Sequence, residues 1–192
     1  TTLDISDGSA TTTQAAGSLS LDLAVANITG AITVDATAAS DNATTLNVTA
    51  STAQNALTII DGAPTATQAL TINLSGAVAV TAAAATEAAH LNASSMTGAL
   101  TATFDPDLLQ ITGGSGDDQL FGQSGNDTLD GGSGQDVIDG GSGYDVIDAG
   151  GGHDIVNGGI GHDELMGGAG DDMVYGEVGN DVLDGGAGVD VL

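Results

Sequence analysis

Nine aspartates at a constant spacing carry the clearest chemical potential in this sequence. The chain holds 26 acidic residues and no Lys or Arg, so its formal net charge is −26. Because no Lys or Arg can neutralise these carboxylates, the sequence predicts that they bind metal cations, for which carboxylate oxygens are hard ligands. The nine recur every ninth residue through the second half of the chain, at Asp118, Asp127, Asp136, Asp145, Asp154, Asp163, Asp172, Asp181 and Asp190.

The aspartates belong to a nonapeptide repeat that fills residues 113–192. Numbered from Gly113, position 4 is glycine, position 6 is aspartate and position 8 is aliphatic in all nine units, the last of which lacks its ninth residue. The pattern G-G-x-G-x-D-x-U-x, in which U is aliphatic, is typical of calcium-binding repeats. Glycine at positions 1, 2 and 4 permits backbone conformations with positive φ, and such turns can direct carbonyl oxygens at one point. Calcium, which takes about six to eight oxygen ligands, suits that arrangement.

On these motifs, residues 113–192 resemble the RTX (repeat-in-toxin) family. The resemblance implies that two nonapeptides form one turn of a right-handed parallel β-roll. It implies that the first six residues of each unit form a calcium-binding turn and that the last three form a short strand. The implied metal ligands are the nine aspartates and turn glycines, namely Gly114, Gly116, Gly125, Gly132, Gly134, Gly141, Gly143, Gly150, Gly152, Gly159, Gly161, Gly168, Gly170 and Gly179.

Two units per turn would stack residues eighteen apart in the sequence, about 4.8 Å from one another. One column then begins at Asp118 and the other at Asp127, and calcium between neighbours in each column gives about seven or more ions. Three substitutions depart from the repeat, since Gln123 and Glu177 replace glycine at position 2 and Ala149 replaces it at position 1. We expect the weakest loops around Gln123 and Glu177.

The first 112 residues differ in composition, since they hold few glycines and are rich in Thr, Ala, Ser, Val and Leu. A helix or a loop is predicted at 81–91, because alanine favours helices but no Lys or Arg lies near the end of that stretch. We therefore expect an all-β chain, with a Thr/Ala-rich, solenoid-like β-strand region at 1–112 and a calcium β-roll at 113–192 that ends a parallel β-solenoid. Period-two alternation predicts short strands at 19–25, 31–34, 46–50, 70–74, 78–80, 100–104 and 109–111.

Residues 91–102 and 109–114 resemble the Thr/Ala-rich, Lys-poor regions that precede RTX repeats in bacterial surface-layer (S-layer) proteins of the Caulobacter type. The resemblance implies an extracellular protein of the cell surface, exported by type I secretion with an uncleaved C-terminal signal. No basic, then apolar, N-terminal signal peptide is visible, in agreement with that route. Because the array stops within a unit at Leu192, we expect a piece of a longer protein.

Composition also excludes several classes of function. A chain without basic side chains cannot bind nucleic acid phosphates, and no apolar stretch is long enough to cross a membrane. The absence of Cys excludes disulfides and thiolate metal sites. His153 and His162 are nine residues apart and should lie on opposite sides of the roll, so a shared zinc site is not expected. No H-E-x-x-H motif is present, and we expect no enzyme activity.

The function predicted from the sequence is structural: a secreted, calcium-binding protein that self-assembles into a surface layer or a related extracellular lattice. Assembly should need more calcium than folding, with the outer Asp130, Asp139 and Asp148 as candidate contacts. Two alternatives remain open. One is an adhesin or matrix-binding module, and the other is the non-catalytic C-terminal part of a type I secreted enzyme.

Overall fold

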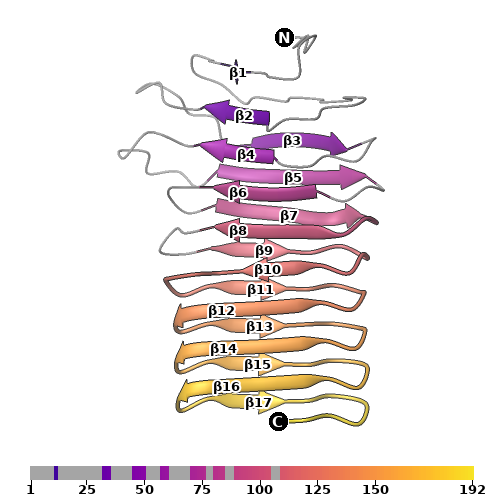
Figure 1. The fold of residues 1–192 in the computed structure, drawn as a ribbon, viewed down its shortest axis with the longest axis vertical. Coiled ribbons are helices and arrows are strands. Elements are labelled where there is room, and N and C mark those ends of the chain that lie inside the picture. Colours follow the sequence, from indigo (N-terminus) through magenta and orange to yellow (C-terminus); the bar gives the residue numbers. More distant parts are fainter. Residues whose placement is uncertain are drawn as a thin grey trace.

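The computed structural model describes residues 11–12, 32–35, 45–50, 57–60, 70–76, 80–84, 89–104 and 109–192. Within these residues the chain is all-β, without a helix, and its strands are stacked in one pile from the N-terminal to the C-terminal end (Figure 1). None of the described residues forms a helix of the length and apolarity that crossing a membrane requires.

The strands form two sheets that the chain visits in alternation. The nine-stranded sheet runs in the order β1 (Thr11–Thr12), β2 (Ile32–Asp35), β4 (Leu57–Ile60), β6 (Val80–Ala84), β8 (Leu100–Phe104), β10 (Gln119–Phe121), β12 (Val137–Gly143), β14 (Ile155–Gly161) and β16 (Met173–Gly179). The eight-stranded sheet contains β3 (Thr45–Ala50), β5 (Leu70–Gly76), β7 (Ala89–Met96), β9 (Gln110–Thr112), β11 (Thr128–Asp130), β13 (Val146–Asp148), β15 (Glu164–Met166) and β17 (Val182–Asp184).

Every strand pairs in parallel with its neighbours in the same sheet, which makes the fold a parallel β-solenoid. In the array, Gln119 pairs with Val137 and Thr128 pairs with Val146, so one turn takes eighteen residues, or two nonapeptides. The predicted all-β fold class, a parallel solenoid that ends in a roll of nonapeptide pairs, is therefore confirmed. Upstream turns are longer, as the pairing of Ile32 with Leu57 shows.

A continuous row of aliphatic side chains links the two regions of the chain. In the eight-stranded sheet, Ile72, Leu91, Ile111, Leu129 and Ile147 are aligned by successive parallel pairings, and all are buried. They are buried because alternate residues of a strand point to the same face, and here that face is the interior between the two sheets. The sheets thus run through residue 113, where the composition changes.

Most of the predicted strands of the first region coincide with observed ones. The predictions at 31–34, 46–50, 70–74, 100–104 and 109–111 match β2, β3, β5, β8 and β9, whereas the prediction at 78–80 meets β6 only at its first residue. The prediction at 19–25 lies outside the described residues. Strands β1, β4 and β7 were not predicted. β7 was missed although residues 89–94 alternate between apolar and polar, because its first residues fell in the stretch assigned to a helix or a loop.

The prediction of a helix or loop at 81–91 is wrong for residues 81–84 and 89–91, and the remaining four residues of this stretch lie outside the described ones. Residues Val80–Ala84 and Ala89–Met96 are strands β6 and β7. β6 pairs in parallel with β4 on one side and β8 on the other, so its backbone groups are bonded across the sheet. The helix propensity of alanine amounts to less than about 1 kcal/mol per residue and is overridden by such pairing.

Candidate metal centre: two columns of buried aspartates

The position-6 aspartates line the interior of the roll. Each lies two residues before the buried aliphatic residue of its unit and therefore on the same side of the chain. Asp181 and Asp190, in the last two units, are half-buried. The other seven are at most 1% exposed, namely Asp118, Asp127, Asp136, Asp145, Asp154, Asp163 and Asp172.

One carboxylate oxygen of each aspartate is used by the fold. Oδ1 of Asp136 accepts a hydrogen bond from the backbone N–H of Asp118, and Oδ1 of Asp154 accepts one from Asp136, both at 2.8 Å. In the second column, Oδ1 of Asp145 accepts the N–H of Asp127 at 2.9 Å. The predicted stacking of aspartates eighteen residues apart, in two columns, is thus present in the structure.

In five of the aspartates the second carboxylate oxygen is buried and has no hydrogen-bond partner within the protein, whereas Oδ2 of Asp118 accepts the N–H of Gly114 at 2.9 Å. Burial of an ionised oxygen without a partner is costly unless a cation or a proton neutralises it. The chain supplies no Lys or Arg for this purpose. This state is shared by the Oδ2 atoms of Asp136, Asp145, Asp154, Asp163 and Asp172.

The burial of these carboxylates also shifts their proton affinity. Burial is the main cause that raises the pKa of Asp136 to about 7 and that of Asp145 to about 6, although the backbone N–H donors oppose the shift. Burial raises the pKa of Asp118 and Asp154 in the same direction. Without a metal ion, protons would therefore occupy part of the columns near neutral pH.

Oxygen atoms border a small space beside the glycine at position 1. A methyl group on Gly131 would lie 2.6 Å from Asp136 Oδ2 and 2.6 Å from the carbonyl oxygen of Ala149. A methyl group on Gly167 would lie 2.7 Å from Asp172 Oδ2 and 2.8 Å from the carbonyl oxygen of Gly185. In each case a carboxylate oxygen and a carbonyl oxygen of the following turn face the space beside the glycine; Ala149 is the one position-1 residue that carries a methyl group.

A second set of oxygens lies beside the glycine at position 4. A methyl group on Gly161 would lie 2.7 Å from Asp163 Oδ1 and still closer to the carbonyl oxygen of Gly143. Gly179 is placed in the same way, between Asp181 Oδ1 and the carbonyl oxygen of Gly161. The predicted glycines at position 4 thus direct their carbonyl oxygens along the stack, toward the aspartate of the next turn.

These donors fit a hard divalent cation. Among the described residues, no three His, Cys, Asp or Glu side chains gather around one point. An ion between two turns would therefore take carboxylate oxygens from the columns and most other ligands from backbone carbonyls. Calcium, which accepts many oxygen ligands in flexible geometry, suits that donor set. The assignment of each aspartate and glycine as a ligand remains a prediction.

Position 2 shows where the repeat is under strain. Its glycines other than Gly114 have positive φ, as at Gly132 (96°) and Gly141 (99°). Gln123 and Glu177 occupy the same position with φ of 74° and 65° and are the only described residues other than glycine with positive φ. An L-residue in this region costs about 1–2 kcal/mol. This strain lies in the two loops that were expected to be weakest.

The sequence analysis missed two groups of residues that help to form the aspartate columns. The position-1 glycines that leave the oxygen-lined space open, such as Gly131 and Gly167, were not included among the site residues, although eight of nine units carry glycine there. Leu100 and Leu109 were missed as well, and their N–H groups donate to Asp118 Oδ1 and Asp127 Oδ1 at 2.7 and 2.9 Å. The eighteen-residue spacing, extended upstream, would have found both leucines.

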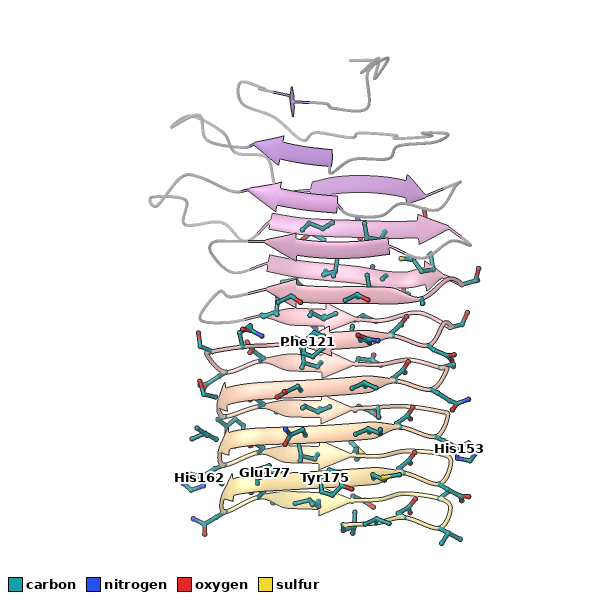
Figure 2. All side chains as sticks on the ribbon, viewed as in Figure 1. Phe121, His153, His162, Tyr175 and Glu177 are labelled. Carbon is teal, nitrogen blue, oxygen red and sulfur yellow. The ribbon has the colours of Figure 1, made fainter. Side chains whose placement is uncertain are left out.

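The array's histidines lie apart from each other. His153 and His162 are at opposite edges of the roll (Figure 2), as the repeat predicted. Each accepts a backbone hydrogen bond on Nδ1 from the residue eighteen positions later, Asp171 and Asn180 respectively. Both side chains therefore support the turns at the edges.

The comparison with protein families agrees with this geometry. Residues 110–138, 130–165 and 157–192 match the family described as RTX calcium-binding nonapeptide repeat (4 copies). No curated protein and no solved structure matches the chain significantly, so the resemblance of the first region to surface-layer proteins has no support from a relative. The repeats indicate a calcium-binding module of the kind found in proteins secreted by type I systems, and hence an extracellular location. From residue 110 to residue 192, the chain consists of RTX calcium-binding nonapeptide repeats.

Proposed function

We propose that this protein is a secreted structural component that folds on calcium and self-assembles into a surface layer or a related extracellular lattice. The roll provides the rigid, calcium-dependent part of each subunit. The role is structural and not catalytic. Calcium ions between neighbouring aspartates of the two columns, about seven in number, would hold the roll together.

A single observation carries this proposal. The buried Oδ2 atoms of five aspartates have no partner within the protein, in a chain that carries 26 acidic residues and no Lys or Arg. A fold of this composition needs external cations, and it stays unfolded where cations are scarce. A secreted protein with this property folds only after export into a calcium-rich exterior, which suits a component of a coat outside the cell.

Assembly requires further neutralisation. Seven calcium ions would contribute +14 against a formal charge of −26, which leaves about −12, and like-charged subunits repel each other. We therefore propose that contacts between subunits bind additional calcium on outer carboxylates such as Asp130, Asp139 and Asp148. Assembly should then begin at a higher calcium concentration than folding.

The test is a calcium titration in which folding and assembly are recorded together, by circular dichroism and light scattering, with electron microscopy of the end state. We expect strand formation first, scattering at higher calcium, and ordered arrays in the micrographs. Magnesium should substitute poorly, because it requires a tighter octahedral shell and loses water reluctantly.

Two outcomes would contradict the proposal. A protein that folds with calcium but never scatters or forms arrays would favour the adhesin or the enzyme-tail alternative. A protein that folds equally well in chelator would contradict the role of calcium itself.

A further inference from the structure

The outer face of the nine-stranded sheet carries a row of exposed apolar side chains within the roll. Parallel pairing aligns Val137 with Ile155 and Ile155 with Met173 in one row of position-7 side chains, which are 38%, 41% and 44% exposed. Phe121 and Tyr175 belong to the adjacent row of position 9, Phe121 at the upstream end and Tyr175 toward the downstream end of the roll (Figure 2), with Asp139 and Asn157 between them. We call the five apolar residues the apolar face. Aligned, exposed apolar side chains of this size indicate a contact surface.

The opposite outer face of the roll is acidic. Outward positions 7 and 9 of the eight-stranded sheet carry four carboxylates, namely Asp130, Asp148, Glu164 and Asp184. The same positions of β10, β12, β14 and β16 carry one, Asp139. Two copies of this chain repel each other over most of their surface, and the apolar face is where contact brings the fewest carboxylates together.

The spacing of the row favours a second copy of the chain as its partner. Successive side chains along the row are one turn apart, about 4.8 Å. A surface with the same period can contact every side chain of the row, and a second copy has that period together with the same low charge. Two such sheets can pack face to face at about 10 Å, related by a two-fold axis. A basic partner would bind the acidic face instead.

We propose that the apolar face is the surface through which two copies of the calcium-loaded roll pair face to face. This inference rests on the proposed self-association and adds a pairing surface that is distinct from the calcium-bridged contacts at Asp130 and Asp148. The row of Val137, Ile155 and Met173 spans only about 10 Å along the stack. The pair is therefore weaker than a standard dimer interface, and it forms at high protein concentration or within a lattice where many contacts act together.

The test uses the double variant Ile155→Thr and Met173→Thr in calcium-saturated protein, with sedimentation velocity over a series of concentrations. The matched control is Val182→Thr, which changes an equally placed position-7 side chain, 65% exposed, on the acidic face. We expect the double variant to raise the dimer dissociation constant about tenfold or more. The control should dimerise as the wild type does, and circular dichroism should show equal strand content in all three.

Cross-linking gives a second measurement that does not depend on weakened binding. The chain contains no Cys, so Ile155→Cys introduces a single thiol at the apolar face and Val182→Cys introduces one on the acidic face. At a calcium concentration that folds the roll but lies below the onset of light scattering, a short bismaleimide should link Ile155→Cys into dimers and leave Val182→Cys monomeric.

The failures of the two proposals can be distinguished. If the wild type associates and the double variant associates equally well, or if Val182→Cys cross-links as efficiently as Ile155→Cys, this surface is wrong and self-assembly stands. If the wild type stays monomeric at every concentration and does not cross-link at position 155, both the surface and the proposed self-association are wrong.

Discussion

Each buried aspartate uses its two carboxylate oxygens in different ways. Oδ1 of Asp136 accepts a backbone hydrogen bond from the preceding turn, so it takes part in the fold whether or not a metal is bound. Oδ2 of the same residue is buried without a protein partner and faces the space left by Gly131. One side chain therefore connects the stacking of turns to the binding of a cation.

Substitution of Gly131 by alanine should weaken calcium binding. The added methyl group would lie 2.6 Å from both Asp136 Oδ2 and the Ala149 carbonyl oxygen, and overpacking of this kind costs about 1–3 kcal/mol. We expect the calcium concentration at the midpoint of folding to rise about tenfold. The control is Gly151→Ala, where a methyl group would have nothing within 4 Å. Equal midpoints for both variants, measured by circular dichroism, would show that the space beside position 1 is not part of the site.

Restoration of glycine at position 2 should stabilise the roll. Gln123 and Glu177 have φ of 74° and 65°, and Gln123→Gly or Glu177→Gly removes the strain of an L-residue in that region. We expect a gain of about 1 kcal/mol in the free energy of unfolding with calcium present, measured by denaturant titration. The control, Gln135→Gly, has no positive φ to relieve and should lose about 0.5–1 kcal/mol. Destabilisation by all three changes would contradict this account.

At the scale of the strands, the aspartates act as columns. Asp118, Asp136, Asp154 and Asp172 are linked head to tail by N–H to Oδ1 bonds across successive turns. Parallel pairing with an eighteen-residue turn brings these carboxylates together, and repulsion from Asp118 and Asp154 adds to the effect of burial on the pKa of Asp136. A cation between two turns would remove both penalties at once.

Stability of the metal-free roll should fall as the pH rises. In the folded state, Asp136 and Asp145 keep their protons up to about pH 7 and 6, whereas the ordinary pKa of an aspartate is 3.8. Between pH 4 and 7 the unfolded chain binds fewer protons than the folded roll, so each step upward favours unfolding, and the effect levels off outside this window. Circular dichroism of metal-free protein should therefore show more strand at pH 4 than at pH 7.5.

Two variants isolate the buried group in this experiment. Asp136→Asn removes a titrating carboxyl from the column and should flatten the pH dependence. Asp148→Asn removes the same charge from an exposed position and should leave the dependence close to that of the wild type. An equal effect of both changes would assign the pH dependence to the overall charge of the chain. Calcium affinity should rise over the same pH window, because calcium must displace the bound protons.

At the scale of the whole molecule, the two sheets are continuous, but the side chains that fill the interior between them change along the stack. Leu100 and Leu109 stand eighteen residues before Asp118 and Asp127 and donate N–H groups to them. Both leucines are buried, so the interior is apolar upstream of this level and carries carboxylates downstream of it. Calcium should therefore matter for one part of the solenoid more than for the other.

Removal of calcium should unfold the solenoid from the array side. In excess chelator at neutral pH, hydrogen exchange measured by mass spectrometry should show lost protection in peptides from 113–192. Peptides from 89–104, which surround the buried Leu91 and Leu100, should keep more of their protection because their interior needs no cation. With calcium restored, both sets should be protected. Equal loss in the two parts would mean that the solenoid folds as one cooperative unit that depends on metal throughout.

The sequence by itself determined the array. Nine residues per unit, with glycine, aspartate and an aliphatic residue at fixed positions, leave one chemically sensible arrangement, in which turns bind cations and strands stack. The period, together with the resemblance to RTX repeats that it carries, therefore predicted the roll, the two columns and the weakest loops at Gln123 and Glu177. Such prediction succeeds because each repeat contacts only its neighbours, so that local rules fix the structure.

Only the tertiary structure decided those features of the fold that the nonapeptide period does not predict. Ala-rich residues 80–84 became strand β6 because β4 and β8 lie on either side of it, and no local preference reveals such neighbours. Only the stacked structure brings Leu100 to the end of the first aspartate column and places Val137, Ile155 and Met173 in one exposed row. Pairing between strands far apart in the sequence depends on burial and hydrogen bonding over the whole solenoid. The sequence of a single segment therefore does not reveal it.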